Sequence, residues 1–320
     1  MVSNNESDII IQELLKNAEV AAEGTNIASR IHSEEIPKLL LHKNKVVGVK
    51  TINGIEIKTE ETKSGVKAEV RVLKNHKIKE PIYMCFGVLE ENYEQHIDMK
   101  FIIEENSEVK VYAFCTFPRS VKVVHKMIAE YELKKNSKFS YNEFHYHGQK
   151  GALVDSRTTA KLDDNAKLST SFTLLHGTVG DLFYYINSEL KNKARFVTVA
   201  KIKSKDKDEV VVDENAKLLG KESAAMLKSR LAVSDDARAK FTGEIVGVGD
   251  DSRGHVDCKE ILLDNGRAET IPKLVVINKK SRLTHEAAIG SVDKKELQTL
   301  EARGLTREEA INLIVRGMLE

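Results

Sequence analysis

Three residues in the C-terminal third of the sequence have side chains that bind soft metals or sulfur. Cys258 lies in the segment GHVDCKEI, and His285 and Glu286 follow in the segment LTHEAAIG. Thiolates are soft ligands, and imidazole and carboxylate groups can complete such a set. The alternative is that Cys258 is a small buried hydrophobe, the commonest role of a free cysteine.

Strand geometry limits which of these side chains can meet. If the segment around Cys258 is extended, Cys258 shares a face with Glu260, whereas His255 points to the opposite face and is not expected to be a co-ligand. By the same alternation, His285 and Glu286 point to opposite faces if both lie in a strand. One of them can then bind a metal while the other orients or packs, and the sequence leaves open which one does so.

A second group of potential ligands lies in the segment YNEFHYHG. On a strand, Glu143, His145 and His147 share one face at intervals of about 7 Å, since each residue rises by roughly 3.3 Å, and a His-x-His pair can chelate one ion. Phe144 and Tyr146 take the other face, which we expect to point inward. The alternative is that the polar face is simply exposed to solvent.

Cys115 precedes Glu143 by close to one period of the repeat described below. Together with His125 it could therefore approach the same face from the preceding coil. This candidate second patch for a metal or for sulfur contains Cys115, Glu143, His145 and His147.

Composition excludes several classes of function. The 320 residues include 50 basic and 49 acidic ones, and this net charge of +1 does not point to nucleic acid or to an anionic membrane. The first residues, MVSNNESDIIIQELLKN, do not resemble a signal peptide, and no apolar run reaches the roughly 18–20 residues of a membrane span. Three widely spaced cysteines without a CxxC motif favour free thiols in a reducing compartment. We therefore expect a cytoplasmic protein.

The elements that must position these residues fall into three parts. Residues 1–44 carry apolar side chains at helical spacing, residues 45–275 alternate apolar and polar side chains as strands do, and residues 276–320 return to helical patterns. The sequence therefore predicts an N-terminal helical part, a core of strands and a C-terminal helical part.

A weak internal repeat organises the strands. A phrase typical of a tight turn followed by a strand begins at Asn106, Asn136, Asn165, Lys193, Asn215, Asp236 and Asn265. The intervals are nearly equal, except for two shorter ones on either side of Asn215. Repeats of this length made of strands indicate a solenoid, because one unit cannot bury its face alone. We predict a mainly β protein with a parallel β-helix core; the alternative is an antiparallel sandwich with hairpins of similar length.

The last thirty residues predict two short helices. Asp293 with Glu296, and Thr306 with Glu309, are each spaced as a capping box, and Gly304 separates the two helices. Their apolar stripe can pack on the end of the solenoid or bind a partner, and both can hold. The residues expected to contact a partner are Arg303, Gly304, Ala310, Leu313, Ile314 and Met318.

Several of these segments resemble a known family. GHVDCKEI, LTHEAAIGSVDKKELQTLEARGL and REEAINLIVRGML resemble the C-terminal signature of the SufB/SufD family, the scaffold proteins of the Suf iron-sulfur cluster assembly system. PIYMCFGVLEENYEQHIDM and HKMIAEYELKKNSKFSYNEFHYHG resemble its short archaeal-type members. The resemblance covers roughly residues 80–320.

The resemblance implies a right-handed parallel β-helix between helical parts, and a partner, the ABC-type ATPase SufC, docked on the C-terminal helices. It also implies a homodimer through the β-helix cores, with a nascent, labile iron-sulfur cluster, expected to be 4Fe-4S, near that interface. The cluster-binding residues of the family fall on Cys258, His285 and Glu286. Recipient apo-proteins or carriers would take the finished cluster; no nucleic acid or membrane partner is implied.

The sequence also departs from the long bacterial SufB proteins. It lacks their Cys-rich N-terminal motif, and Leu133 stands where their sulfur-receiving cysteine is expected. Free sulfide, or entry through Cys85 or Cys115, is an open alternative, although Cys85 lies in an apolar run and is expected to be buried and inert.

Three functions compete. The first is a cluster scaffold, and the second is a SufD-like subunit that supports the ATPase complex or iron entry without binding a cluster; the retained Cys258 argues against the latter. The third is a carbohydrate-active enzyme, which the absence of Trp and of aromatic-acid clusters disfavours. The sequence contains no P-loop motif, so we expect no enzyme activity in this chain and ATP hydrolysis in the partner.

Overall fold

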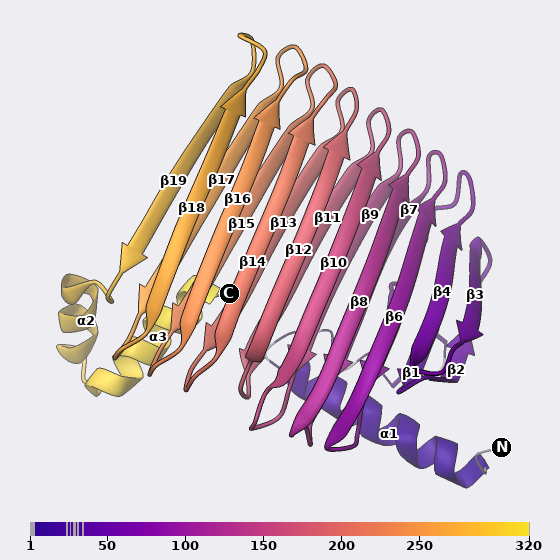
Figure 1. Ribbon diagram of the computed structural model, residues 1–320, viewed down its shortest axis with the longest axis horizontal. Coiled ribbons are helices and arrows are strands. Elements are labelled where there is room, and N and C mark those ends of the chain that lie inside the picture. The colour runs from indigo at the N-terminus through magenta and orange to yellow at the C-terminus, as the bar shows by residue number, and fades with distance from the viewer. Residues whose placement is uncertain are drawn as a thin grey trace.

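The computed structural model describes residues 4–319, apart from 24, 26, 28, 29, 31 and 34. Its described part begins with α1 (Asn4–Ala21), continues through nineteen strands and ends with α2 (Lys294–Glu301) and α3 (Arg307–Leu319). The strands stack as successive coils of a solenoid, with α1 beside the N-terminal half and α2 and α3 beside the C-terminal half (Figure 1).

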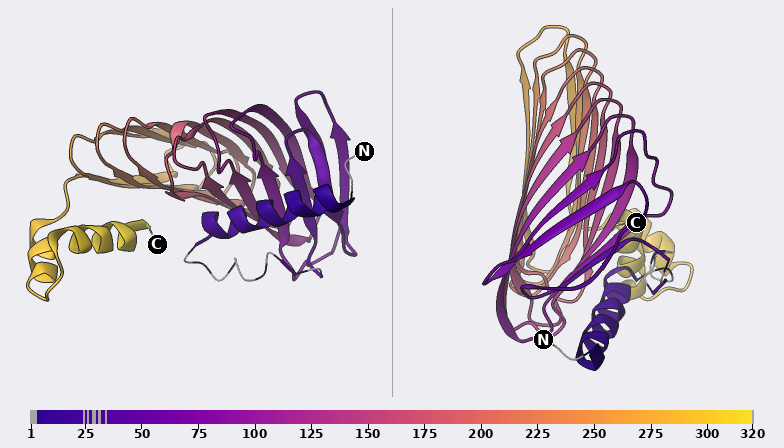
Figure 2. Two further views of the ribbon diagram at one scale, coloured as in Figure 1. Left: turned by 90° about the horizontal axis from the view of Figure 1, so that it is seen from below. Right: turned by 90° about the vertical axis from the view of Figure 1, so that its right-hand side faces the viewer.

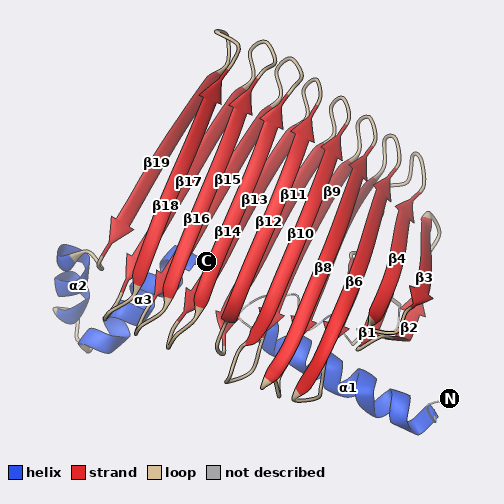
Figure 3. Cartoon of the chain, in the orientation of Figure 1, coloured by secondary structure: helices blue, strands red, loops and turns tan. Residues whose placement is uncertain are grey.

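The strands form two sheets, and consecutive strands of the coils alternate between them (Figure 3). The first sheet has ten strands in the order β19 (Arg282–Gly290), β17 (Arg253–Leu262), β15 (Ala224–Val233), β13 (Arg195–Ser204), β11 (Lys167–His176), β9 (Lys138–Tyr146), β7 (Glu108–Thr116), β5 (Ile82–Gly87), β1 (Lys38–His42) and β2 (Lys45–Lys50). The second has nine, in the order β18 (Arg267–Val276), β16 (Arg238–Gly247), β14 (Glu209–Leu218), β12 (Gly180–Leu190), β10 (Ala152–Leu162), β8 (Lys122–Leu133), β6 (Asn92–Ile103), β4 (Gly65–Val72) and β3 (Ile55–Glu61).

Neighbouring strands in each sheet are parallel from β1 and β5 onward in the first sheet and from β4 and β6 onward in the second. The pairing runs without a shift over most of each strand, so that β17 and β19 pair from Arg253 with Arg282 to Ile261 with Gly290. Each residue therefore lies beside its counterpart in the next coil. The predicted parallel β-solenoid is confirmed.

Asparagines at one corner of the coils explain part of the repeat. Asn75, Asn106, Asn136 and Asn165 all have φ between 58° and 63°, in the left-handed region that asparagine tolerates better than most residues. Their side-chain amides also form a ladder, in which each donates to the preceding one at 2.9, 2.9 and 3.2 Å. The asparagines thus form the turns, and their side chains hydrogen-bond each turn to the one in the neighbouring coil.

The predicted repeat was wrong at Asn215, and its last two phrases, at Asp236 and Asn265, lie at the opposite corner, where strands of the first sheet lead to the second. Asn215 lies in the middle of β14 and not at a turn, and the left-handed residue that continues the corner after Lys193 is Glu222. The two shorter intervals on either side of Asn215 therefore do not measure coils. The spacing from Lys193 to Glu222 equals the spacing from Glu222 to Asp251, the next left-handed residue of that corner, so the coils are regular there.

Both helical parts pack on the outer face of the first sheet. Leu14 and Ala18 of α1 join a buried cluster with Phe114 of β7 and Phe144 of β9. Residues of α2 and α3 form a second cluster with Ala232 of β15 and Ile261 of β17, and its buried helical members are Leu297, Ala310, Val315, Met318 and Leu319. Figure 2 shows both helical parts on the same side of the solenoid.

The two ends of the solenoid differ. At the N-terminal end, β2 pairs antiparallel with β1, and β3 pairs antiparallel with β4, so each sheet closes with a reversed strand. At the C-terminal end, β18 and β19 are the last strands of their sheets, and most residues of β19 are exposed. The outer backbone edges of β18 and β19 therefore have no further strand beside them among the described residues.

The strands extend beyond both limits of the core expected from the sequence. β1 already begins at Lys38, inside the expected N-terminal helical part, and β18 and β19 carry the sheets from residue 275 to Gly290. The segment 282–290 is a strand because it pairs residue by residue with β17, a tertiary interaction that its own composition does not reveal. The helices α2 and α3 begin only after it, each with the predicted capping residues.

Candidate metal and cluster sites

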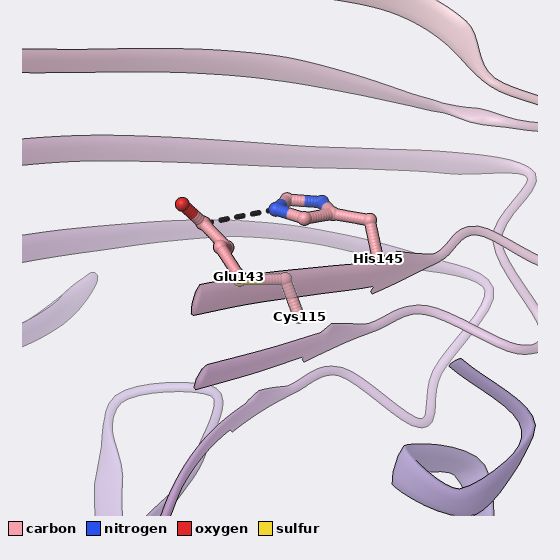
Figure 4. A group of neighbouring side chains, drawn as sticks. All are labelled: Cys115, Glu143 and His145. Carbon is pink, nitrogen blue, oxygen red and sulfur yellow. Dashed lines mark hydrogen bonds and ion pairs between the residues drawn. The ribbon is translucent and has the colours of Figure 1, made fainter. Parts of the chain in front are cut away.

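Cys115, Glu143 and His145 meet inside the solenoid. Cys115 is on β7 and the other two are on β9, where Cys115 pairs in register with His145. Sγ of Cys115 lies 3.4 Å from Oε1 of Glu143, and the same oxygen lies 2.9 Å from Nε2 of His145. One donor atom of each residue lies within 4.8 Å of the others, and all three side chains are buried (Figure 4). The structure thus brings together three of the four residues of the predicted second patch.

The orientation of β9 differs from the one expected from the sequence. Glu143, His145 and His147 point into the solenoid and are 3, 0 and 0 % exposed, so they do not form a solvent-exposed polar face. Phe144 and Tyr146, which were expected to point inward, lie on the outer face in the cluster beneath α1. The expectation was wrong because the helix supplies an apolar cover for the outer face.

His147 holds His145 in one tautomer. Nδ1 of His147 lies 2.8 Å from the carbonyl oxygen of Val179, which can only accept, so this nitrogen donates. Nε2 of His147 is then an acceptor for Nδ1 of His145, 2.9 Å away. The remaining nitrogen of His145, Nε2, consequently directs a lone pair toward Glu143 when the ring is neutral. His147 therefore supports the group from behind.

His125 reaches the group from β8 in the facing sheet and is held in the same way. The amide nitrogen of Gln95 donates to the carbonyl oxygens of Lys43 at 2.7 Å and Gly87 at 3.4 Å, which leaves its oxygen to accept from Nδ1 of His125 at 2.9 Å. Nε2 of His125 then faces Sγ of Cys115 at 3.9 Å. Gln95 was not identified from the sequence, although it pairs with His125 one coil away.

Burial shifts the pKa values of Cys115, His125 and His147 toward their uncharged forms. It raises the pKa of the Cys115 thiol well above its usual value, and the Glu143 carboxyl raises it further. It lowers the pKa of His125 to about 3, with a smaller contribution from His145, and it lowers the pKa of His147 well below its usual value. A positive charge in the centre of the group would reverse this balance and favour the thiolate.

Cys258 lies at the other end of the interior. It is on the inner face of β17, in register with Ser229 of β15 and Ala287 of β19, and it is 1 % exposed. Glu260, the next inward residue, is 2 % exposed and accepts a hydrogen bond of 2.6 Å from Oγ of Ser229. Burial, and after it the Glu260 carboxyl, raises the pKa of the Cys258 thiol to about 12.

Strand alternation around Cys258 follows the sequence-based expectation. Cys258 and Glu260 are buried on the same face, whereas His255 lies on the opposite face and bonds Oγ1 of Thr284 at 2.8 Å. The sequence placed Glu260 on the correct face but assigned it no role. Its carboxyl is the group of β17 that most directly affects the Cys258 thiol.

His285 and Glu286 lie on β19, the last strand, and both are exposed. His285 pairs in register with Val256, a buried residue of the inner face, and Glu286 pairs with Asp257. Since paired residues of parallel strands point to the same side, His285 shares the face of Cys258 and Glu286 takes the other face. Of these two predicted ligands, only His285 is thus on the inner side. It lies at the C-terminal end of the solenoid, which we call the open end because β18 and β19 have no further strand beside them among the described residues.

The predicted partner-binding residues separate into two groups. Ala310 and Met318 are buried in the cluster that joins α3 to the first sheet, and Ile314 is partly buried against it. Arg303, Gly304 and Leu313 are exposed, and Leu313 is 49 % exposed. The single apolar stripe expected from the sequence was therefore wrong for Leu313, which lies away from the packed side.

Cys85 and Leu133 are both buried. Cys85 lies on the outer face of β5 beneath α1, where Sγ is 4.0 Å from the carbonyl oxygen of Leu14 and burial raises the thiol pKa to about 12. Leu133 is on the inner side of β8 and is 1 % exposed. Cys115 is 0 % exposed, so neither Cys85 nor Cys115 offers a surface thiol for sulfur entry.

Comparisons with known proteins agree with this architecture. The family model described as the SUF system FeS cluster assembly, SufBD core domain, matches residues 89–318, which is most of the chain. With this match, the solenoid belongs to the iron-sulfur cluster assembly class of proteins.

Two archaeal relatives match nearly the whole chain. An iron-sulfur cluster assembly SufBD family protein of Methanocaldococcus jannaschii is 39 % identical over 88 % of this chain and 90 % of its own length. Another, of Pyrococcus horikoshii, is 35 % identical over 90 % of this chain and 88 % of its own length. This chain belongs to the SufBD family of iron-sulfur cluster assembly proteins.

No helix in the described part of the chain is both long enough and apolar enough to cross a bilayer.

Proposed function

We propose that this chain is a scaffold subunit on which a nascent iron-sulfur cluster, its cargo, is built and from which it is transferred. The observation that carries the proposal is the placement of Cys258 and His285 on one face at the open end of the solenoid. A thiolate and an imidazole at an open end suit a cluster that must both form and leave.

The proposed ligands are Cys258 and His285, with Glu286 as the weaker candidate because its register places it on the opposite face. Cys258 is a neutral thiol in the free chain, since its pKa is raised to about 12, so binding of iron must displace its proton. Glu260 is the nearest inward carboxyl along β17 and is suited to receive that proton, because burial also raises its own pKa.

A homodimer would complete the ligand set. One subunit offers one cysteine and one histidine, which is few for a cluster, whereas a two-fold axis at the open end would bring two copies together. The free edges of β18 and β19 support this arrangement, as do three exposed apolar side chains there: Val276, Ile277 and Ile289, which are 52, 67 and 47 % exposed. Exposed edges of this kind are ready to pair with another chain.

We further propose that an ABC-type ATPase of the SufC kind docks on the C-terminal helices. Arg303, Gly304 and Leu313 are available for that contact, whereas Ala310 and Met318 connect α3 to β15 and β17. Closure of the ATPase dimer would then pull on strands next to Cys258 and open the interface, as a ligand shifts a two-state assembly. The reactivity of Cys258 toward a thiol reagent should rise on addition of ATP to the full complex; an unchanged reactivity would contradict this coupling.

The competing function is a SufD-like subunit that supports the ATPase complex or iron entry without binding a cluster. The complete burial of Cys258 and its raised pKa are the observations that favour it.

Anaerobic reconstitution of the full complex with iron and sulfide separates the two functions. We compare wild type with Cys258→Ala and with Cys85→Ala, a matched control that removes an equally buried thiol from the outer face of the same sheet. The scaffold function predicts that the spectrum of a 4Fe-4S cluster is lost in Cys258→Ala and retained in Cys85→Ala. A full cluster in Cys258→Ala would overturn the ligand assignment and favour the supporting subunit.

A further inference from the structure

We propose that Cys115, Glu143 and His145 bind one divalent transition-metal ion, of the zinc or ferrous type, inside the sealed N-terminal half of the solenoid. This ion would be a resident of the fold, separate from the cluster proposed at the open end. The inference does not depend on the scaffold function, because the two sites lie in different coils and share no residue.

The donor atoms already lie near the separations that a metal requires. Tetrahedral zinc binds nitrogen and oxygen at about 2.0 Å and sulfur at about 2.3 Å, which places an N,O pair of ligands about 3.3 Å apart and an S,O pair about 3.5 Å apart. In the structure, Nε2 of His145 and Oε1 of Glu143 are 2.9 Å apart, and Sγ of Cys115 is 3.4 Å from that oxygen. These two pairs differ from the required separations by a few tenths of an ångström at most, and all three donor atoms lie within 4.8 Å of one another.

The hydrogen bonds behind the group leave its lone pairs free. His145 donates through Nδ1 to His147, which in turn donates to the carbonyl oxygen of Val179, and Nε2 of His145 is left to face inward. Metal-bound histidines nearly always have such a partner on the other ring nitrogen. The chain of two imidazoles and a carbonyl therefore fixes the tautomer that binds a metal.

A further imidazole approaches Cys115 from the facing sheet. His125 is held by Gln95 so that its Nε2 faces Sγ of Cys115 at 3.9 Å, although it is not one of the three donors that lie within 4.8 Å of one another. Those three donors are sulfur, oxygen and nitrogen, a mixed set that suits zinc and ferrous iron better than magnesium or calcium, which prefer oxygen.

The charges of the ion and of its proposed ligands also balance. A divalent ion with one thiolate and one carboxylate is neutral overall, so its burial carries no net charge into the interior. Formation of the complex breaks the S–H bond of Cys115, and that proton leaves to solvent. Glu143 would bind as the carboxylate and His145 through the lone pair of its neutral ring, and no electron is transferred.

Aromatic rings surround the group. The ring centroids of His145 and Phe172 are 4.4 Å apart. The centroid of the Phe117 ring lies 5.2 Å from that of His125 and 5.3 Å from that of His147. Both phenylalanines are 0 % exposed. An ion placed here would enter while the coils assemble and would leave slowly, which distinguishes a resident ion from cargo.

The test is refolding of the full chain from denaturant under anaerobic conditions with Zn²⁺, Fe²⁺ or Co²⁺, followed by removal of loosely bound metal with a chelator. Co²⁺ is the spectroscopic probe, because a thiolate ligand produces a charge-transfer band in the near ultraviolet. We expect about one ion per chain to survive the chelator, together with that band. Wild-type protein that retains no ion and shows no band after refolding with any of the three metals would overturn the proposal without any variant.

Three cysteine variants assign the band. Cys258→Ala should keep both the ion and the band, whereas Cys115→Ala should lose the band. Cys85→Ala is the control for removal of a buried thiol from the same sheet and should behave as wild type. If Cys115→Ala fails to refold, the band of the Cys85→Ala,Cys258→Ala double variant decides, because Cys115 is then the one thiol left in the chain; a missing band there would contradict the site.

Discussion

Cys115 and Cys258 both lie on the inner face of the first sheet, yet their surroundings differ. Cys115 lies on β7 with several strands of its sheet on either side, and its neighbours Glu143, His145 and His125 come from both sheets. Cys258 lies on β17, and among the described residues only β19 follows it in that sheet. Both thiols point into the same interior, so the difference lies in what closes the solenoid around each of them.

This difference suggests how one fold can hold metal in two ways. In the N-terminal half, which we call the closed half because reversed strands end both sheets there, the proposed ligands are fixed by interior hydrogen bonds and covered by phenylalanine rings. Such surroundings suit an ion that stays. At the open end, His285 is exposed and the edges of β18 and β19 have no further strand beside them among the described residues, which suits the proposed cluster that must leave. If both proposals hold, the solenoid keeps the two functions apart because each coil contacts only its neighbours.

The largest expected effect concerns the packing of the closed half. Phe172→Ala removes a ring that is 0 % exposed and touches the rings of His145 and Tyr184, at 4.4 and 4.9 Å. We expect a loss of about 3–5 kcal/mol in the free energy of unfolding. Ile289→Ala at the open end should change it by less than about 0.5 kcal/mol in the monomer. Urea unfolding of dilute protein measures both, and equal losses would show that the two ends do not differ in packing.

Glu214, on β14 between the two regions, predicts a pH dependence. Its side chain is 0 % exposed, Oε1 accepts from Oγ1 of Thr198 at 2.9 Å, and burial raises its pKa to about 8. Because the folded pKa lies above the unfolded one, the protonated carboxyl contributes stability that is fully present below about pH 4.5 and is lost as the pH rises through 8.

Glu214→Gln removes that titration. Over this range the stability of wild type should fall by a few kcal/mol relative to the variant, since one unit of pKa corresponds to about 1.4 kcal/mol. Urea unfolding between pH 5 and pH 9 measures the difference. Parallel curves for the two proteins would mean that the carboxyl is not protonated in the folded interior.

His147 provides a sharper test of the closed site than its direct ligands do. His147→Gln removes the imidazole that orients His145 but leaves the three proposed donors in place. We expect Co²⁺ affinity to fall roughly 10–100-fold, as for other residues that support metal ligands, while the thiolate band keeps its position. His176 is the last residue of β11, and His176→Gln is the control variant, which should bind Co²⁺ with the affinity of wild type. Equal affinities of all three proteins would contradict the positioning role.

Much of the fold could be predicted from the sequence because the solenoid repeats its local chemistry. Asn106, Asn136 and Asn165 each make a left-handed turn before an alternating strand, and that combination is visible in one sequence. Asn215 is followed by the same Ala-Lys-Leu as Asn165 but lies within β14, since a turn phrase is not by itself a turn. From the sequence, His285 and Glu286 could lie in a strand, but their segment was assigned to the helical part, because its partner β17, not its composition, makes it a strand.

The residues of the second patch could be grouped from the sequence but not oriented. Alternation correctly grouped Glu143, His145 and His147 on one face, yet it could not say which face is interior, because Phe144 on the outer face of β9 is buried as well. The outer face owes its burial to the packing of Phe144 beneath α1, which is distant in sequence. The hydrogen bonds that set the tautomers, through Gln95 and Val179, also come from distant coils and leave no local pattern.

The smallest expected effect concerns the open edge itself. Ile289→Lys places a charge on β19, where the side chain is 47 % exposed, and lysines on edge strands discourage pairing with another chain. If the open end is the dimer interface, we expect dissociation to increase about tenfold, which corresponds to about 1.4 kcal/mol. Sedimentation at several protein concentrations measures it.

Ile128→Lys is the matched control for that charge. Ile128 is 57 % exposed on β8, which has strand neighbours on both sides in the closed half of the second sheet. The same substitution there removes a similar exposed side chain but touches no free edge, so dimerisation should not change. A similar weakening in both variants would attribute the effect to net charge, and an unchanged dimer in Ile289→Lys would place the interface away from the open end.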